Sequence, residues 1–307
     1  MKLPSGTCRL NFKPTNSFAL NLNHITRSAS VAAPRNPLAR PRKSIYPTPM
    51  HLIDTHTHLD FPDFDADRSQ LLANARDKGV ERLVVLGVYQ SNWQRVWDLA
   101  QENDSLYAAL GLHPVYLEQH HPDHLNELRT WLERLAGDKK LCAVGEFGLD
   151  YYLPELDRGR QQAMFEAQLM LAAEFGLPPL LHVRRSHAQV IATLKRFKLK
   201  RPGIIHAFAG SYEEAREYIK LGFKLGLGGA PTWPQALRLR KVVAQLPAEA
   251  VVLETDAPDM APAMHPEQRN SPAHLPDICA ALAEIRGETT EDFARVTTEN
   301  ARAVFGW

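Results

Sequence analysis

The sequence contains few cysteines and no long apolar run, and each absence excludes a class of protein. Its three cysteines, Cys8, Cys142 and Cys279, have neither the spacing of a cysteine metal motif nor the even number of a disulfide framework. No run of about eighteen apolar residues occurs, so no transmembrane helix is predicted. Scattered cysteines are typical of proteins in the reducing cytoplasm, which is the location we expect.

The first 49 residues lack acidic side chains altogether. They hold eight of the 36 basic residues and none of the 35 acidic ones, so the chain from Met50 onward carries a formal charge of −7. This leader has no apolar core of a secretory signal. It is an organellar transit peptide or, in the interpretation we favour, sequence upstream of a true start at Met50. We expect residues 1–49 to be a disordered basic extension and residues 50–307 to be the folded domain.

Eight apolar runs of strand length alternate with amphipathic helical stretches along residues 50–307. The runs are Leu52–Asp54, Arg82–Leu86, Tyr107–Leu112, Leu141–Gly145, Leu180–Val183, Gly203–His206, Phe223–Leu227 and Val251–Glu254. This alternation within about 258 residues predicts a single (β/α)8 TIM barrel. An open doubly wound sheet is the alternative. A glycine-rich phosphate turn usually follows its first strand, and His56-Thr57-His58 occupies that place here.

Histidines and acidic residues stand at the ends of the predicted strands. His56 and His58 are separated by one residue, so they project to the same side of an extended chain. The complete set is His56, His58, His113, Glu146, His182, His206 and Asp256. Because the carboxyl ends of barrel strands converge at one mouth, we expect these side chains to meet there.

Such a set of imidazoles and carboxylates supplies enough ligands for two divalent metal ions. A bridging carboxylate can hold two ions about 3.5–4 Å apart, and bound metal lowers the pKa of water from about 15.7 towards 7. Imidazole-rich ligation favours zinc or manganese over an all-oxygen magnesium site, although the sequence leaves the metal open among these three. The reaction class that this chemistry predicts is hydrolysis by metal-activated water.

Short motifs occur in a characteristic order along the domain. They are Ile53–His58 (IDTHTH), Gly111–Pro114 (GLHP), Gly145–Tyr151 (GEFGLDY), His182–Arg184 (HVR), His206–Gly210 (HAFAG), Glu254–Pro258 (ETDAP) and Arg269–Pro272 (RNSP), followed by Leu275–Pro276. In the order and spacing of these motifs, residues 50–307 resemble the TatD-type metal-dependent hydrolases of the amidohydrolase-like barrel superfamily. Within that family the chain is most similar to the YjjV branch.

The resemblance implies a distribution of the ligands between two metal ions. His56, His58 and Asp256 would hold one ion and His182 and His206 the other, with Glu146 bridging the two. It also implies that Asp256 accepts a proton from the attacking water, so Asp256 and Glu146 are the expected catalytic residues.

Three further residues are candidates for binding substrate. Arg184 and Arg269 would grip phosphate oxygens, because a guanidinium group binds them bidentately. The alternative for each is a surface ion pair. His113 would contact the substrate or shape the rim of the mouth.

The resemblance further implies cleavage of phosphodiester bonds, described in the family as deoxyribonuclease and for some members as exonuclease activity. A domain charge of −7 lacks the broad basic face of a duplex-binding protein. We therefore expect a single-stranded DNA end or a short oligonucleotide as substrate, cleaved as by a 3′ exonuclease. Trp233, Phe208 and Tyr151 follow predicted strands and are candidates for stacking an unpaired base. We expect neither a membrane partner nor an obligate protein partner.

Three alternative functions use the same site. They are hydrolysis of small-molecule esters or amides, deacylation of aminoacyl-tRNA, and an inert metal-holding binding module. Many amidohydrolases bridge their metals with a carbamylated lysine, and the absence of lysine between Leu141 and Asp150 favours the nuclease-type branch. Arg185 and Ser186 follow the HVR motif where many relatives carry an acidic residue, which leaves the substrate preference open.

Overall fold

Eight parallel strands form one sheet, in which each strand pairs with the next along the chain. The computed structural model describes residues 50–307, so the predictions for the basic extension, residues 1–49, lie outside the described residues. The strands are β1 (Leu52–Thr57), β2 (Val80–Leu86), β3 (Leu106–Leu110), β4 (Leu141–Asp150), β5 (Pro179–Arg184), β6 (Ile204–Ile205), β7 (Lys224–Leu227) and β8 (Val251–Leu253). Just beyond β8 the chain returns to β1, where Asp256 N donates to His56 O at 2.9 Å and His58 N to Ala257 O at 2.8 Å. The predicted TIM barrel is confirmed.

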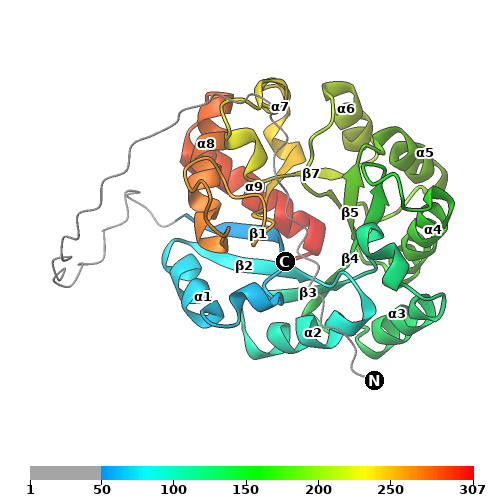
Figure 1. Ribbon diagram of the computed structural model, residues 1–307. Coiled ribbons are helices and arrows are strands. Elements are labelled where there is room, and N and C mark those ends of the chain that lie inside the picture. Colours follow the sequence, from blue (N-terminus) through cyan, green and yellow to red (C-terminus); the bar gives the residue numbers. More distant parts are fainter. Residues whose placement is uncertain (1–49) are drawn as a thin grey trace, which may run out of the picture. The chain divides into compact units, whose positions relative to one another are not determined.

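Helices connect successive strands and surround them in Figure 1. They are α1 (Arg68–Asp77), α2 (Trp93–Glu102), α3 (Asp123–Arg134), α4 (Arg158–Phe175), α5 (His187–Phe197), α6 (Tyr212–Lys220), α7 (Leu237–Val243), α8 (Leu275–Arg286) and α9 (Thr290–Phe305). Within residues 50–307 none of these helices is both long and apolar enough to cross a bilayer. The cytoplasmic location stays a prediction.

The hydrophobic core has two parts, one on each side of the strands. On β2 the alternation is clear: Leu83 and Val85 belong to the part shared with the surrounding helices, and Val84 and Leu86 to the smaller part inside the barrel. The inner part is Ile53, Val84, Leu86, Ala109, Cys142, Ala143, Leu180, Ile204, Val252, Ala301, Val304 and Phe305. The last three come from α9, so the final helix closes the amino-terminal end of the barrel. Polar side chains are therefore left for the opposite end.

The prediction for the fourth strand was wrong in its carboxyl-terminal boundary. The predicted run stopped at Gly145, whereas β4 continues to Asp150. After a register shift between Val144 and Phe147, the residues from Phe147 to Asp150 pair with β5. The glycines and acids of this segment resemble a turn in sequence. A Cβ atom on Gly148, whose φ is +154°, would lie only 2.0 Å from the carbonyl oxygen of His182, so glycine permits the close approach of the two strands.

Candidate metal centre

The residues expected at the mouth meet around Glu146, which is only 2% exposed. Its two oxygens face different pairs of imidazoles. Oε2 lies 3.1 Å from His56 Nε2 and 3.4 Å from His58 Nε2. Oε1 lies 3.1 Å from both His113 Nε2 and His182 Nδ1. A carboxylate with one oxygen towards each pair has the arrangement that a bridge between two metal ions requires.

Asp256 and His206 complete the cluster beside the first imidazole pair. Asp256 Oδ1 is 3.5 Å from His58 Nε2 and 3.7 Å from His56 Nε2, and Oδ2 is 3.7 Å from His206 Nε2. The rings of His56 and His206 stack with centroids 3.5 Å apart. The rings of His182 and His206, predicted to share one metal ion, have centroids 6.5 Å apart.

The donor atoms suit a transition metal, because they are imidazole nitrogens and carboxylate oxygens converging on small volumes. Three groups have ligand atoms within 4.8 Å of one another: His56, His206 and Asp256; His56, His58 and Glu146; and His113, Glu146 and His182. The structure thus brings all six predicted ligands together. It adds His113 as a seventh donor, where the sequence suggested a substrate contact or a rim residue.

Two carboxylates behind the cluster were not identified from the sequence as functional. Asp150 is fully buried, and its Oδ2 lies 3.0 Å from His182 Nε2, so it can orient the ring whose Nδ1 faces Glu146. Glu254 Oε1 lies 2.9 Å from His206 Nδ1 in the same way. Partners of this kind fix the tautomer and the orientation of a metal-binding histidine. In the sequence, the signal that could have identified Asp150 and Glu254 is an acidic residue within or next to an apolar strand.

A third buried acid, Asp54, joins β1 to the segment just beyond β8, where the barrel closes. Its Oδ2 accepts a hydrogen bond from Thr255 Oγ1 at 2.6 Å, and its Oδ1 accepts one from the Thr255 amide at 3.0 Å. Burial raises the pKa of Asp54 to about 7, against the opposing effect of these bonds. Asp54 lies two residues before His56, and Thr255 directly precedes Asp256. This contact therefore fixes the two predicted ligands relative to each other.

Residues in the left-handed region of φ follow three of the strands at the mouth. They are Arg185 (φ +55°) after β5, Ala207 (φ +43°) after β6 and Asp256 (φ +58°) after β8. This conformation is unfavourable for residues other than glycine and persists where surrounding contacts impose it. At Ala207 one such contact is the hydrogen bond from its amide to Glu254 Oε1 at 2.7 Å.

The electrostatics of the cluster suit a cation. Burial would raise the pKa of Glu146, but the surrounding histidines hold it well below its ordinary value, so the carboxylate is charged. Burial lowers the pKa of His113 to about 4, which leaves the neutral imidazole that metals bind. For His206 burial is outweighed by the carboxylates of Glu254 and Asp256, which raise its pKa to about 10. A metal ion at this place would displace that proton.

The two predicted arginines differ in their surroundings. Arg184 ends β5, and its guanidinium carbon lies 3.7 Å from the centre of the Tyr152 ring. Arg269 Nη2 donates to Asp67 Oδ2 at 2.6 Å, and the guanidinium lies over the ring of Phe64 at 4.6 Å. Arg184 therefore lies on the strand that carries His182, whereas Arg269 is engaged with the segment between β1 and α1.

Of the aromatic side chains suggested for base stacking, Phe208 is excluded by burial. It is 2% exposed and packs against Tyr218 and His187 of the neighbouring helices. Its ring therefore offers no face to a base. Tyr151 and Trp233 are partly exposed, and Trp233 Nε1 donates to Ala261 O at 3.1 Å.

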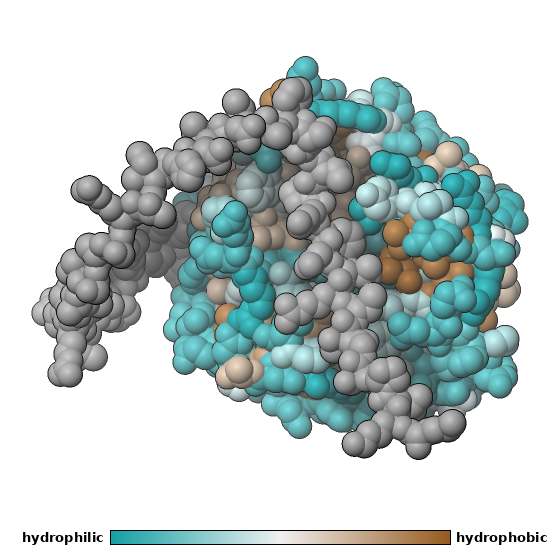
Figure 2. Space-filling view, in the orientation of Figure 1, coloured by the Kyte–Doolittle hydropathy of each residue, from teal (hydrophilic) through white to brown (hydrophobic). Residues whose placement is uncertain are grey.

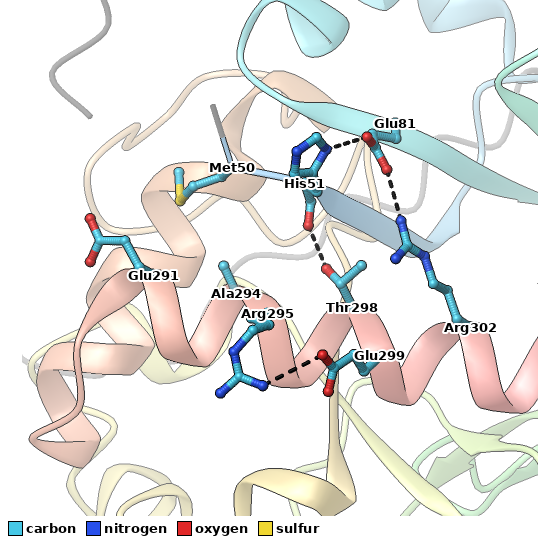
Figure 3. Close-up of a pocket in the computed structure, with 9 residues that line it drawn as sticks. All are labelled: Met50, His51, Glu81, Glu291, Ala294, Arg295, Thr298, Glu299 and Arg302. Carbon is cyan, nitrogen blue, oxygen red and sulfur yellow. Dashed lines mark hydrogen bonds and ion pairs between the residues drawn. The ribbon is translucent and has the colours of Figure 1, made fainter. Parts of the chain in front are cut away.

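A cavity of about 480 Å³ lies at the other end of the barrel, between the start of β1 and α9 (Figure 3). Thr298 Oγ1 donates to His51 O at 2.6 Å, and Glu81 pairs with His51 and with Arg302. On its walls Glu81 is thus paired with Arg302, and Glu299 with Arg295. The visible face of the described domain is mostly hydrophilic, with smaller hydrophobic areas (Figure 2). The metal cluster is therefore the strongest candidate for chemistry.

A family model described as TatD related DNase matches residues 53–306. The chain belongs to the TatD family. It is 41% identical over 253 residues to an Escherichia coli protein named as an uncharacterized metal-dependent hydrolase, YjjV, covering 82% of this chain and 97% of that TatD relative. The crystal structure of the E. coli YjjV protein, a TatD homologue, matches with a TM-score of 0.80 and 40% identity, over 83% of this chain and 98% of the other. The predicted family and its YjjV-like character are confirmed.

A TatD relative with a more specific name is more distant. The protein named 3′-5′ ssDNA/RNA exonuclease TatD of Pantoea ananatis is 34% identical over 265 residues, covering 83% of this chain and 99% of its own length. The family model and these relatives identify the present chain as a metal-dependent hydrolase of the TatD family.

Proposed function

We propose that this hydrolase uses two divalent metal ions to cleave phosphodiester bonds at the ends of single-stranded nucleic acids. The observation that carries the proposal is the position of Glu146, whose two oxygens lie 3.1–3.4 Å from two separate imidazole pairs. In this proposal His56, His58 and Asp256 would hold one ion, and His182 would help to hold the other. His206, which the resemblance assigns to the same ion as His182, has its Nε2 3.7 Å from Asp256 Oδ2 and would join the first group, and His113 would take its place beside His182.

When bound, such ions polarise a phosphoryl oxygen and lower the pKa of water towards 7. The protein supplies the acceptor for the proton of that water. Asp256 suits this role because its side chain is 15% exposed, whereas that of Glu146 is 3% exposed. Burial would raise the pKa of Asp256, but His206 and His58 hold it below its ordinary value, so the group is a carboxylate at neutral pH.

The choice of a single-stranded nucleic acid rests on two supports. The TatD relative of P. ananatis carries the name of a single-strand exonuclease. In addition, residues 50–307 carry a formal charge of −7, which disfavours tight binding of a duplex with its high charge density. A short, flexible end can bring one phosphate to the cluster with fewer contacts.

The proposal is tested with purified protein freed of metal and then supplied with zinc, manganese or magnesium. We expect release of mononucleotides from single-stranded DNA labelled at its 5′ end, with shortening from the 3′ end, and loss of this activity with chelator. Duplex DNA, a charged tRNA and simple carboxyl esters are assayed beside it.

Controls separate the alternatives. Glu146→Gln and Asp256→Asn should abolish cleavage, whereas Asp98→Asn, an exposed aspartate on α2, should leave it intact. Faster turnover of esters or of charged tRNA than of oligonucleotides would replace the proposal with one of the other hydrolases. Absence of metal-dependent turnover on every substrate would favour a binding module.

A further inference from the structure

Two arginines and a tyrosine form a stacked group beside the metal cluster. The guanidinium carbons of Arg184 and Arg185 lie 3.7 Å and 4.7 Å from the centre of the Tyr152 ring. We call these three residues the arginine stack. Tyr152 is 38% exposed and Arg185 is exposed, so the group faces solvent.

The backbone around the arginine stack is held in place by buried contacts. The amide of Tyr151 donates to Arg184 O at 2.8 Å, and Ser186 Oγ donates to Leu149 O at 2.7 Å. The amide of Tyr152 donates to Asp150 Oδ1 at 2.8 Å. Because the other oxygen of Asp150 lies 3.0 Å from His182 Nε2, one carboxylate links the stack to a candidate metal ligand.

Arg185 has the features of a residue placed to bind an anion. Its backbone has a φ of +55°, a conformation that a non-glycine residue adopts only under constraint. Within residues 50–307 Arg185 forms no ion pair: no carboxylate oxygen lies within 4.0 Å of its guanidinium nitrogens. The guanidinium of Arg184 approaches the same ring, so an anion beside Tyr152 would meet two positive charges.

We propose that the arginine stack binds a second phosphate of the substrate, next to the phosphate that is cleaved. This inference rests on the proposed function. His182 and Arg184 are two residues apart on β5 and therefore project to the same side, about 7 Å apart along the strand. That spacing is comparable with the separation of consecutive phosphates in an extended nucleotide chain.

The chemistry of the stack fits phosphate. Guanidinium groups bind phosphate oxygens bidentately. A guanidinium stacked on an aromatic ring is already oriented, so it loses less conformational entropy when it binds. The second phosphate is a neighbouring phosphodiester or a terminal phosphate, and both present the same oxygens. The substrate class is thus a nucleotide chain with at least two phosphates.

The test compares a dinucleotide that has one internal phosphate with the same dinucleotide carrying an additional 5′- or 3′-phosphate. In wild-type protein we expect kcat/KM to be higher for at least one of the phosphorylated forms. Arg185→Gln should reduce the ratio of kcat/KM values, phosphorylated to unphosphorylated, by about ten-fold, the effect of losing a charge-assisted hydrogen bond. Tyr152→Leu should reduce the ratio less, and Tyr152→Phe, which keeps the ring, should preserve it.

The matched control is Arg76→Gln, which removes an exposed arginine in the last turn of α1, at the opposite end of the barrel. Its ratio should equal that of the wild type. The inference would be overturned by a ratio in Arg185→Gln equal to that of the wild type, or by a wild-type ratio near one. Either result would leave phosphodiester cleavage established.

A binding experiment separates failure of the site from failure of the proposed function. A fluorescent single-stranded trinucleotide is titrated with metal-free protein in chelator. Binding that weakens about ten-fold in Arg185→Gln, with a smaller dependence on salt, supports the phosphate site even where no substrate is cleaved. Equal binding by wild type and Arg185→Gln contradicts it.

Discussion

Replacement of Asp150 by asparagine tests the metal cluster without removing any residue that faces a metal ion. Asp150 is fully buried. Its Oδ1 accepts a hydrogen bond from the amide of Tyr152 at 2.8 Å, and its Oδ2 lies 3.0 Å from His182 Nε2. In Asp150→Asn, the side-chain carbonyl oxygen of the asparagine must accept the hydrogen bond from the Tyr152 amide, because the NH2 group cannot. The NH2 group is then left to face His182 Nε2.

The substitution therefore changes the favoured tautomer of His182. With aspartate, Nε2 donates to Asp150, which would leave the lone pair of Nδ1 for a metal ion on the side of Glu146. With asparagine, Nε2 becomes the acceptor and the proton moves to Nδ1, which then cannot bind metal. Loss of such a supporting carboxylate typically weakens metal affinity 10- to 100-fold, about 1.4–2.7 kcal/mol.

The assay is competition for metal between the protein and a chromophoric chelator, with thermal unfolding measured in parallel to check the fold. We expect one of two sites to weaken about 10- to 100-fold in Asp150→Asn and neither to change in Asp98→Asn. Equal affinities in wild type and Asp150→Asn would refute the proposed role of His182 as a ligand oriented by Asp150.

Three further predictions concern the proton acceptor, the core and the pH dependence of stability. Asp256→Asn should lower kcat at least about 100-fold with the fold retained, and retained kcat at saturating metal would exclude Asp256 as proton acceptor. Phe305→Ala, which empties the α9 side of the inner core, should cost about 3–5 kcal/mol in urea unfolding; a loss below 1 kcal/mol would contradict the closed barrel end. Burial, with His265 and Lys78 nearby, lowers the pKa of His274 to about 4, below its unfolded value near 6.5. The neutral ring of His274 therefore contributes to the free energy of unfolding fully above pH 6.5, and this contribution is lost as the pH falls towards 4. Between pH 6.5 and 4 a His274→Asn variant should lose about 1–2 kcal/mol less stability than the wild type, after allowance for partial exposure. Parallel pH profiles for the two proteins would contradict this.

The fold and the composition of the candidate site could be predicted because both depend on local patterns. Apolar runs alternate with helices eight times, and polar residues such as His56 and Asp256 stand where those runs end. A barrel brings such positions together whatever the details of its strands.

The remaining features depend on pairings between distant segments. Whether His113 contacts solvent or Glu146 is decided by the neighbouring strands β3 and β4, and the sequence contains no signal for the 3.1 Å contact. Similarly, Phe208 follows a strand but is buried by Tyr218 of α6. The end of β4 was missed because pairing with β5 overrides the turn-like glycines before Asp150.

The most direct test of the metal centre is anomalous X-ray diffraction from crystals of the protein loaded with manganese or zinc. We predict two anomalous peaks flanking Glu146, one within bonding distance of His56 and His58 and the other within bonding distance of His182. Peaks elsewhere, or none at full metal loading, would contradict the account.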